Sequence, residues 1–320
     1  MNDVLTRASA IGIIPVIAIE NADHAVPLAN ALGEGGLPAA EVTFRTAAGE
    51  EAIRRIAENC PDILVGAGTV LNIDQCKRAI AAGARFIVSP GYSQELVDYC
   101  LEQEIPVLPG CVNASDMTRA VNSGLEIAKF FPAEASGGVS FLKALAPVFP
   151  KLKFMPTGGV NTKNMMDYLS FDRIVACGGT WMVKKDLIEG EQWEEITRIC
   201  ADAVKTMLGY ELRHVGVNCG SEAEAEQAAR TFAALFGFDY KAGSASCFAG
   251  SALECMKQPF LGDHGHIAIG TNSVDRAIFQ LSRQGVRFDE STRKTDDKGR
   301  TKAIYLQEPV AGFAIHLVQK

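Results

Sequence analysis

Lys129 is the residue whose surroundings most clearly indicate chemistry. It lies in the segment Ile127–Pro132, in which no other residue is charged. Apolar surroundings favour the neutral form of an amine, and a neutral amine attacks ketones. The iminium that results is an electron sink, which cleavage of a carbon–carbon bond next to a ketone requires. The segment therefore predicts a Schiff-base nucleophile. The alternative is a lysine that extends its ammonium into solvent from a strand end.

An acid and a cation stand four residues apart in the segment EVTFRT. Glu41 is flanked by Ala39, Ala40 and Val42, and a carboxyl group among apolar neighbours suits a general acid and base. The planar guanidinium of Arg45 matches a carboxylate better than an ammonium does. We expect Glu41 to move protons and Arg45 to bind a substrate carboxylate. An ion pair between the two, or a solvated arginine, is the alternative.

Two pairs of glycines, Gly158–Gly159 and Gly178–Gly179, each end a short apolar run. Backbone N–H groups that no side chain covers, at the start of a helix, bind phosphate without help from a cation. We therefore expect both pairs to cradle a phosphate group at the start of a helix. Plain tight turns are the alternative.

Eight short apolar runs must position these residues. Each run is followed by a turn with Gly, Pro or Asn and then by a helical pattern. Eight such repeats fit a closed (β/α)8 TIM barrel, with an open doubly wound sheet as the alternative. Polar and glycine residues gather at the carboxyl ends of the runs, where barrel active sites lie, and this favours the barrel. The runs span residues 14–19, 39–44, 63–69, 86–90, 105–110, 127–132, 153–159 and 173–179.

The repeating pattern stops at Gly209, so we expect one domain over residues 1–209 and a smaller α+β domain over residues 210–320. The second domain holds four of the five histidines. It also contains an internal repeat, because His214-Val-Gly-Val and a helical segment are echoed by His266-Ile-Ala-Ile and a helical segment. Two paired modules around a shared cleft are predicted.

The second half of this repeat is longer than the first. We expect the charged stretch Ser291–Lys302 to absorb the extra residues as a loop.

The composition excludes several classes of protein. The net charge is −7, no basic tract occurs, and no apolar run reaches the length of a bilayer, so neither nucleic acid nor membrane is an expected partner. The nine cysteines are an odd number without a C-x-x-C pair, which predicts reduced thiols. The start of the chain lacks the pattern of a secretory signal. We therefore expect a cytoplasmic protein.

Residues 1 to about 208 resemble the 2-keto-3-deoxy-6-phosphogluconate (KDPG) and 4-hydroxy-2-oxoglutarate (KHG) aldolase family of Schiff-base barrels. The resemblance implies a lyase that needs no cofactor, with Lys129 as nucleophile and Glu41 as acid and base. It implies 2-keto acid substrates that yield pyruvate, and a homotrimer. The matching motifs, in order, are EVTFRT (41–46), VGAGTVLN (65–72), SPG (89–91), KFFPAE (129–134), PTGG (156–159) and GGTW (178–181).

The resemblance also assigns the walls of the substrate pocket to Thr69, Pro90, Phe131 and Thr157. Thr180 is a departure, because the family usually has serine there, and the extra methyl narrows the predicted phosphate site. The segment 111–114 reads Cys-Val-Asn-Ala, where the family often has a Thr-Pro pair. The sequence therefore leaves open whether KDPG or KHG is preferred.

Residues 210–320 resemble the vicinal-oxygen-chelate superfamily of glyoxalases and extradiol dioxygenases, built from paired βαβββ modules. The resemblance places metal ligands at His214, Glu254, His266 and His316, a set suited to Zn, Ni, Fe or Mn. The last ligand is usually glutamate, so His316 is a departure, and His264 has no assigned place. Either the domain adds a metal-dependent isomerase, lyase or dioxygenase activity, or it is a binding or assembly module.

Overall fold

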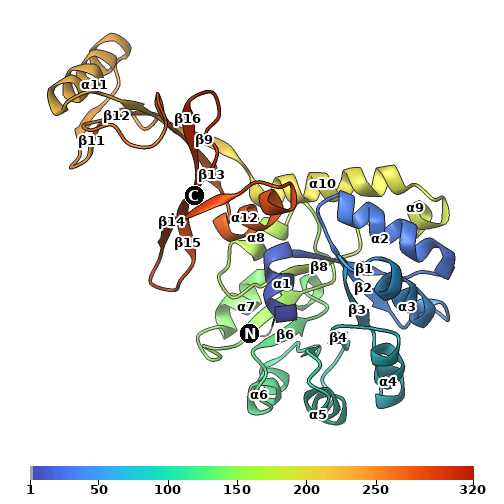
Figure 1. The fold of residues 1–320 in the computed structure, drawn as a ribbon. Helices are drawn as coiled ribbons and strands as arrows, with labels where there is room; N and C mark the ends of the chain where they lie inside the picture. Colours follow the sequence, from blue (N-terminus) through green and yellow to red (C-terminus); the bar gives the residue numbers. More distant parts are fainter. Residues whose placement is uncertain (1–2) are drawn as a thin grey trace. The chain divides into compact units, whose positions relative to one another are not determined.

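The computed structural model describes residues 3–320. The chain divides into two compact units, Met1–Met207 and Leu208–Lys320 (Figure 1). Among the described residues, no helix combines the length and the hydropathy that crossing a bilayer requires.

Eight parallel strands form the centre of the first unit. Six pair in the order β5-β4-β3-β2-β1-β8, and β6 pairs with β7. Parallel bridges between Gly110 and Lys129 and between Thr157 and Gly178 join the two sets into a closed ring. The predicted barrel is confirmed, and the open sheet is wrong. The strands are β1 (Ile13–Ile17), β2 (Ala39–Thr43), β3 (Leu64–Gly68), β4 (Ile87–Val88), β5 (Val107–Leu108), β6 (Ile127–Phe130), β7 (Lys153–Pro156) and β8 (Cys177–Gly179).

Helices surround this ring (Figure 1). They are amphipathic, as in the helix that buries Ala52, Ile53 and Ile56 against the strands. Asn72, Ser93 and Asn113 cap three successive helices by accepting a backbone N–H. The elements are α1 (Asp3–Ile11), η1 (Ala22–His24), α2 (Ala25–Glu34), α3 (Gly49–Asn59), α4 (Ile73–Ala81), α5 (Gln94–Glu102), α6 (Ala114–Asn122), η2 (Glu134–Ser136), α7 (Gly138–Leu145), α8 (Met165–Leu169), α9 (Lys185–Glu189) and α10 (Trp193–Leu208).

The second unit is one eight-stranded sheet with two helices. Its strand order is β10-β11-β12-β9-β13-β16-β15-β14. Each half of the unit runs strand, helix and three further strands, so the element order repeats. The elements are β9 (Glu211–Asn218), α11 (Glu222–Phe236), β10 (Tyr240–Ala242), β11 (Ser246–Ala249), β12 (Leu253–Met256), β13 (Gly265–Thr271), α12 (Val274–Arg283), β14 (Phe288–Thr295), β15 (Thr301–Leu306) and β16 (Phe313–Gln319).

The four inner strands of this sheet come from both halves. β9 and β13 pair antiparallel at the centre, with His266 opposite Gly216 and Ala268 opposite His214. β12 runs parallel to β9, and β16 runs parallel to β13. The first and last strands of each half are therefore neighbours, which brings residues far apart in the sequence to one place.

The predicted loop at Ser291–Lys302 is wrong. β14 continues to Thr295 and β15 begins at Thr301, so the stretch forms the end of a β-hairpin. Its charged side chains suit strands whose ends project into solvent. Charge alone did not distinguish such strands from a loop.

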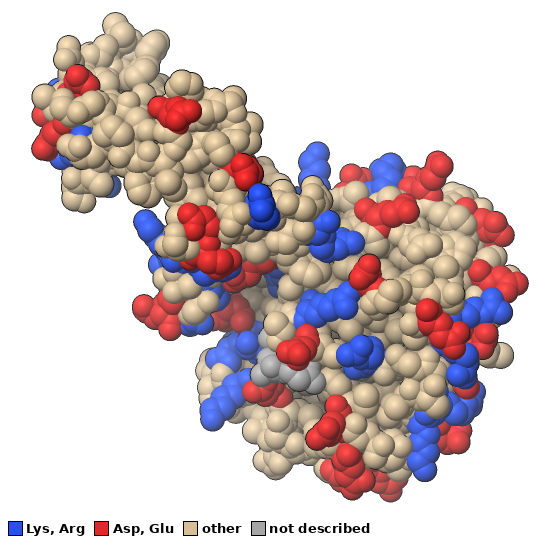
Figure 2. Space-filling view, in the orientation of Figure 1, with Lys and Arg blue, Asp and Glu red and all other residues tan. Residues whose placement is uncertain are grey.

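Acidic and basic side chains are interspersed on the face of the barrel that Figure 2 shows. This face therefore offers no broad basic surface of the kind that neutralises nucleic-acid phosphates.

Candidate active site

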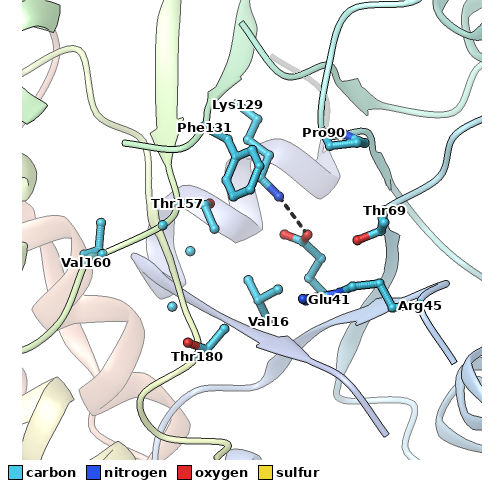
Figure 3. A pocket seen from close by; sticks show the side chains of 14 residues that line it. Val16, Glu41, Arg45, Thr69, Pro90, Lys129, Phe131, Thr157, Val160 and Thr180 are labelled. Atoms are coloured by element: carbon cyan, nitrogen blue, oxygen red, sulfur yellow. Dashed lines mark hydrogen bonds and ion pairs between the residues drawn. The ribbon is translucent and has the colours of Figure 1, made fainter. Parts of the chain in front are cut away.

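Lys129 and Glu41 form an ion pair inside the barrel (Figure 3). Lys129 is the third residue of β6 and Glu41 the third of β2. The Lys129 Nζ lies 3.1 Å from the Glu41 Oε1, and the two residues are 5% and 0% exposed. Taking two charges out of water is unfavourable unless they pair, and breaking such a pair leaves a costly unpaired charge. The chain therefore fixes an amine and a carboxylate in mutual contact on strands 88 residues apart.

The carboxylate of Glu41 retains capacity for a further partner. Its Oε2 is buried and has no hydrogen-bond partner among residues 3–320. Such an atom normally finds a partner in a folded protein. A water or a substrate hydroxyl that enters the cavity can therefore bond to it.

The pair opens into a cavity of about 220 Å³. Every barrel residue that the sequence predicts for the site lines it, which brings together parts of strands β2, β6 and β8 and the loops after β3, β4 and β7. Val16 and Val160 also line it, and sequence reasoning missed them, because a valine in an apolar run looks like any core residue. The lining residues are Val16, Glu41, Arg45, Thr69, Pro90, Lys129, Phe131, Thr157, Gly158, Gly159, Val160, Gly178, Gly179 and Thr180.

Arg45 is the cation at this cavity that is not held by an acid. Its side chain is exposed, extends toward Glu41 in Figure 3 and has no ion-pair partner within the part of the chain that the structure describes. Arg45 is not paired with Glu41, so the alternative of an ion pair between them is wrong. It is exposed but lines the cavity, so it is not simply a solvated surface arginine. It is available to an anionic ligand.

Phe131 and Thr69 shape the wall beside the amine. The Lys129 Nζ lies 5.2 Å from the centre of the Phe131 ring, within range of a cation–π contact. Thr69 has a φ of 55°, which is unusual for a β-branched residue. Strained backbone of this kind persists where the surrounding structure holds it, often at active sites.

The glycine pairs line the cavity, but the prediction that they lie where helices begin is wrong. Gly158 and Gly159 have φ values of 96° and 84° in the loop after β7, whereas α8 begins at Met165. Gly178 and Gly179 belong to β8 and pair with β1. Gly158 and Gly159 therefore supply loop backbone, and Gly178 and Gly179 supply room within a buried strand, instead of a helix terminus.

Gly178 shows what the absence of a side chain provides in β8. A Cβ there would lie 2.2 Å from the Thr157 Oγ1, which is too close for any real side chain. The glycine leaves space for Thr157, whose hydroxyl is buried and unpartnered within residues 3–320. Two unsatisfied oxygens, on Glu41 and Thr157, thus belong to the lining of one cavity.

A second cluster lies on the inner strands of the other unit. The four predicted ligands come together there: the His214 Nε2 and the His266 Nε2 are 3.1 Å apart, and each lies 3.2 Å from the Glu254 Oε2. One nitrogen of His316 lies within 4.8 Å of those of the other two histidines. His264 lies apart, exposed and against the ring of Phe313.

Small residues make room for this cluster. Gly216 stands between Glu254 and His266 in the sheet, and Ala268 stands between His214 and His316. A Cβ on Gly216 would lie 2.0 Å from the His266 ring.

The electrostatics of the cluster favour a charged Glu254 and a neutral His316. Burial raises the pKa of Glu254, but hydrogen bonds from His214, His266 and Ser246 outweigh it and hold that pKa well below its usual range. Burial, with the neighbouring His266 and His214, lowers the pKa of His316 to about 3. Both ring nitrogens of His316 are buried without a partner among the described residues. Neutral imidazole is the form that binds metals.

The closed parallel barrel places the first unit in the (β/α)8 class, and the buried lysine–glutamate pair at its cavity has the groups that an imine-forming enzyme needs. The family model for KDPG and KHG aldolase matches residues 3–199. The chain belongs to this family, and its first unit is an aldolase.

The relatives agree with this assignment. The 2-dehydro-3-deoxy-phosphogluconate aldolase of Haemophilus influenzae is 43% identical over 201 residues, covering 63% of this chain and 95% of the relative. The KHG/KDPG aldolase of Escherichia coli is 42% identical over 193 residues, covering 60% and 91%. The KDPG aldolase of Legionella pneumophila, solved with pyruvate captured at low pH as a covalent carbinolamine intermediate, superposes with a TM-score of 0.61 at 40% identity, covering 63% and 98%.

Proposed function

We propose that the barrel cleaves KDPG to pyruvate and glyceraldehyde 3-phosphate, KHG to pyruvate and glyoxylate, or both. The reaction runs through a Schiff base on Lys129. The observation that carries this proposal is the 3.1 Å contact between the Lys129 Nζ and the Glu41 Oε1 at the wall of a cavity. An amine that forms an imine needs a proton acceptor within hydrogen-bond reach, and Glu41 is that acceptor.

Imine formation begins with a proton transfer from Lys129 to Glu41. The neutral amine then attacks the carbonyl carbon C2 of the substrate and forms a carbinolamine. Glu41 returns its proton to the hydroxyl on C2, which leaves as water, and the nitrogen lone pair completes the iminium. The carboxylate is then ionised again and ready for the next step.

Bond cleavage uses the same carboxylate a second time. Glu41 takes the proton of the C4 hydroxyl, the C3–C4 bond breaks, and its electron pair moves into the iminium to give an enamine. The aldehyde leaves. Glu41 then protonates C3 of the enamine, and water hydrolyses the new iminium to release pyruvate and free Lys129. One carboxylate therefore serves as acid and base in turn.

The remaining residues of the cavity hold the two ends of the substrate. Arg45 is placed to bind the carboxylate that both substrates carry, because its guanidinium lines the cavity without an ion-pair partner among residues 3–320 and suits bidentate binding. Thr69, Pro90, Phe131 and Thr157 enclose the pyruvate part.

Gly158, Gly159, Gly178, Gly179 and Thr180 form the proposed phosphate site. The first two lie in an irregular loop whose backbone no Cβ covers, and such loops bind anions through their N–H groups. KHG has no phosphate and would leave this site empty. Kinetics on both substrates therefore report the use of this part of the cavity separately from the chemistry at Lys129.

Borohydride trapping tests the proposal. Hydride reduces an iminium to a stable amine, so incubation with pyruvate and borohydride should leave a reduced adduct on Lys129 that peptide mass spectrometry locates. Lys153, the exposed first residue of β7, serves as the internal control and should stay unmodified. Label on Lys153 instead of Lys129, or no label, contradicts the mechanism.

The convergence of His214, Glu254, His266 and His316 supports a second proposed function, a divalent metal site in the second unit. Donor atoms of a tetrahedral site with metal–nitrogen bonds of about 2.0–2.1 Å are separated by roughly 3.3 Å. The Nε2 atoms of His214 and His266 are 3.1 Å apart, and His316, with both ring nitrogens unpartnered among the described residues, adds a third imidazole to the one carboxylate. The residues present fit Zn, Ni, Fe or Mn.

A metal bound there would act as a Lewis acid toward a substrate oxygen, which fits an isomerase, lyase or dioxygenase activity added to the aldolase. His214, Glu254, His266 and His316 would hold the ion. Metal content of the purified chain distinguishes this proposal from a binding or assembly module of the same glyoxalase-like fold.

The protein is also proposed to assemble as a homotrimer and to be cytoplasmic. Resemblance to the aldolase family supports a homotrimer, which light scattering tests. The nine free thiols, eight of them buried, suit a reducing compartment and support a cytoplasmic location.

A further inference from the structure

Glu134 and Tyr168 form a pair beside the loop that carries Gly158 and Gly159. Glu134 opens the turn η2, which follows the strand of Lys129, and Tyr168 lies in α8, which follows the glycine loop. The Tyr168 hydroxyl donates a hydrogen bond to the Glu134 Oε1. The pair thus links the segment after the nucleophile to the segment after the proposed phosphate site.

The Glu134 side chain also packs directly on the loop. A Cβ on Gly159 would lie 2.6 Å from the Glu134 Cγ and 2.7 Å from its Cβ, so only glycine admits the glutamate stem at this distance. The Glu134 N–H donates to the Gly158 carbonyl at 3.0 Å. Glu134 therefore meets the loop through both its backbone and its side chain.

The far side of the loop is held by two amides. The Nδ2 atoms of Asn161 and Asn164 donate to the Gly159 carbonyl at 3.0 and 3.1 Å. With its carbonyls bonded in this way, the peptide planes around Gly158 and Gly159 are fixed. The direction of the N–H groups, which a phosphate would meet, is fixed with them.

We propose that Glu134 and Tyr168 are positioning residues that hold the glycine loop at a set distance from Lys129, and so determine how well the phosphorylated substrate binds. The inference rests on the phosphate site of the proposed function. Neither residue lines the cavity, so neither is expected to touch the reacting atoms.

The environment of the pair makes the restraint a firm one. Tyr168 is 1% exposed, and burial together with the Glu134 carboxylate raises the pKa of its hydroxyl, which therefore stays protonated and donates. Glu134 is exposed, and its carboxylate is turned to the tyrosine. A hydrogen bond to a charged group is stronger than a neutral one, so losing it should release the loop measurably.

The test compares Tyr168→Phe, Glu134→Ala and Glu134→Gln in the full chain, with kcat and KM measured on KDPG and on KHG. The first two variants should raise KM for KDPG by about tenfold, since one charged hydrogen bond is lost. Their kcat on KDPG and both constants on KHG should stay within about twofold. Glu134→Gln should restore KM, because its amide oxygen still accepts from Tyr168.

Tyr92→Phe is the matched control. It also removes a tyrosine hydroxyl that joins two segments, here through a hydrogen bond with the Ser123 Oγ at 2.7 Å, and Tyr92 does not line the cavity. It should leave KM for both substrates unchanged. Equal losses on KDPG and KHG in the Tyr168 and Glu134 variants, or no change on either, overturn the inference while pyruvate trapping on Lys129 still stands. A wild-type chain that traps pyruvate but does not cleave KDPG overturns the phosphate site and this inference together.

Discussion

The two units accommodate buried charged and polar side chains in different ways. In the barrel, the amine of Lys129 and the carboxylate of Glu41 neutralise each other and face a cavity. In the second unit, His214 and His266 lie against the single carboxylate of Glu254, and both nitrogens of the neighbouring His316 stay without a partner in the described chain. The charges in the barrel balance without an added ion, whereas the second unit has imidazole nitrogens that no group of the described chain satisfies.

Only the second unit is therefore expected to depend on an ion from outside the chain. A pair that is already neutral can begin proton transfer with its own atoms. A cluster with surplus donors and one acid gains stability from a cation. The barrel should therefore be sensitive to substitutions at Lys129 and Glu41 and insensitive to chelators, whereas the second unit should be sensitive to chelators and insensitive to those substitutions.

The largest effect should come from Lys129→Ala. Without the amine no iminium forms, so cleavage of KDPG and KHG should fall to background while metal binding by the second unit is unchanged. Lys153→Ala, at an exposed lysine, is the control and should keep full activity. Substantial cleavage by Lys129→Ala would remove the Schiff base from the mechanism.

Glu41→Gln should slow turnover by roughly 100-fold or more, as expected when a positioned acid and base is lost. Some adduct should still be trapped by borohydride, because the amine remains. Glu102→Gln, at an exposed glutamate of α5, controls for the change of charge. An unchanged kcat in Glu41→Gln would show that another group moves the protons.

His266→Ala should weaken metal binding by the full-length chain more than about 100-fold, since even residues behind a ligand contribute 10- to 100-fold. Its aldolase activity should survive, and EDTA should lower the thermal stability of the wild-type second unit without slowing the barrel. His264→Ala, a histidine outside the cluster, should bind metal normally. Purified chain without metal, and without uptake at neutral pH, decides for a binding or assembly module.

The smallest effect should come from Thr180→Ser. Removing one methyl widens the proposed phosphate site while the hydroxyl stays, so KM for KDPG should fall by at most about tenfold and KM for KHG should not change.

Free phosphate should compete with KDPG and barely affect KHG. Equal inhibition of both substrates would place the anion site elsewhere.

The sequence predicts those parts of the molecule that depend on local pattern. Each of the eight apolar runs contains or overlaps one barrel strand, because parallel strands buried on both faces need continuous apolar stretches. A charged residue within such an apolar run, such as Lys129 or Glu41, can be recognised from the sequence because its side chain differs from those of its neighbours.

Features that depend on three-dimensional neighbours were not predictable. Val16 and Val160 look like core residues until the cavity is seen. Gly178 was expected at a helix start, yet it lies within a strand because Thr157, from a different strand end, needs its space. The contact of Glu134 with Tyr168 joins residues 34 positions apart, and no periodicity indicates it.

The register between β9 and β13 has a further consequence. Gly216 of β9 pairs with His266 of β13, and His214 of β9 pairs with Ala268 of β13. Each histidine thus stands opposite a small residue that lies two positions after the other histidine. An approximate two-fold axis between the two strands therefore relates the two halves of the second unit. Each half contributes two donors around this axis. Two copies of one half could supply only identical pairs, whereas two halves joined in one chain can differ. Glu254 from one half and His316 from the other are such a difference, and it sets the charge of the site to that of a single carboxylate.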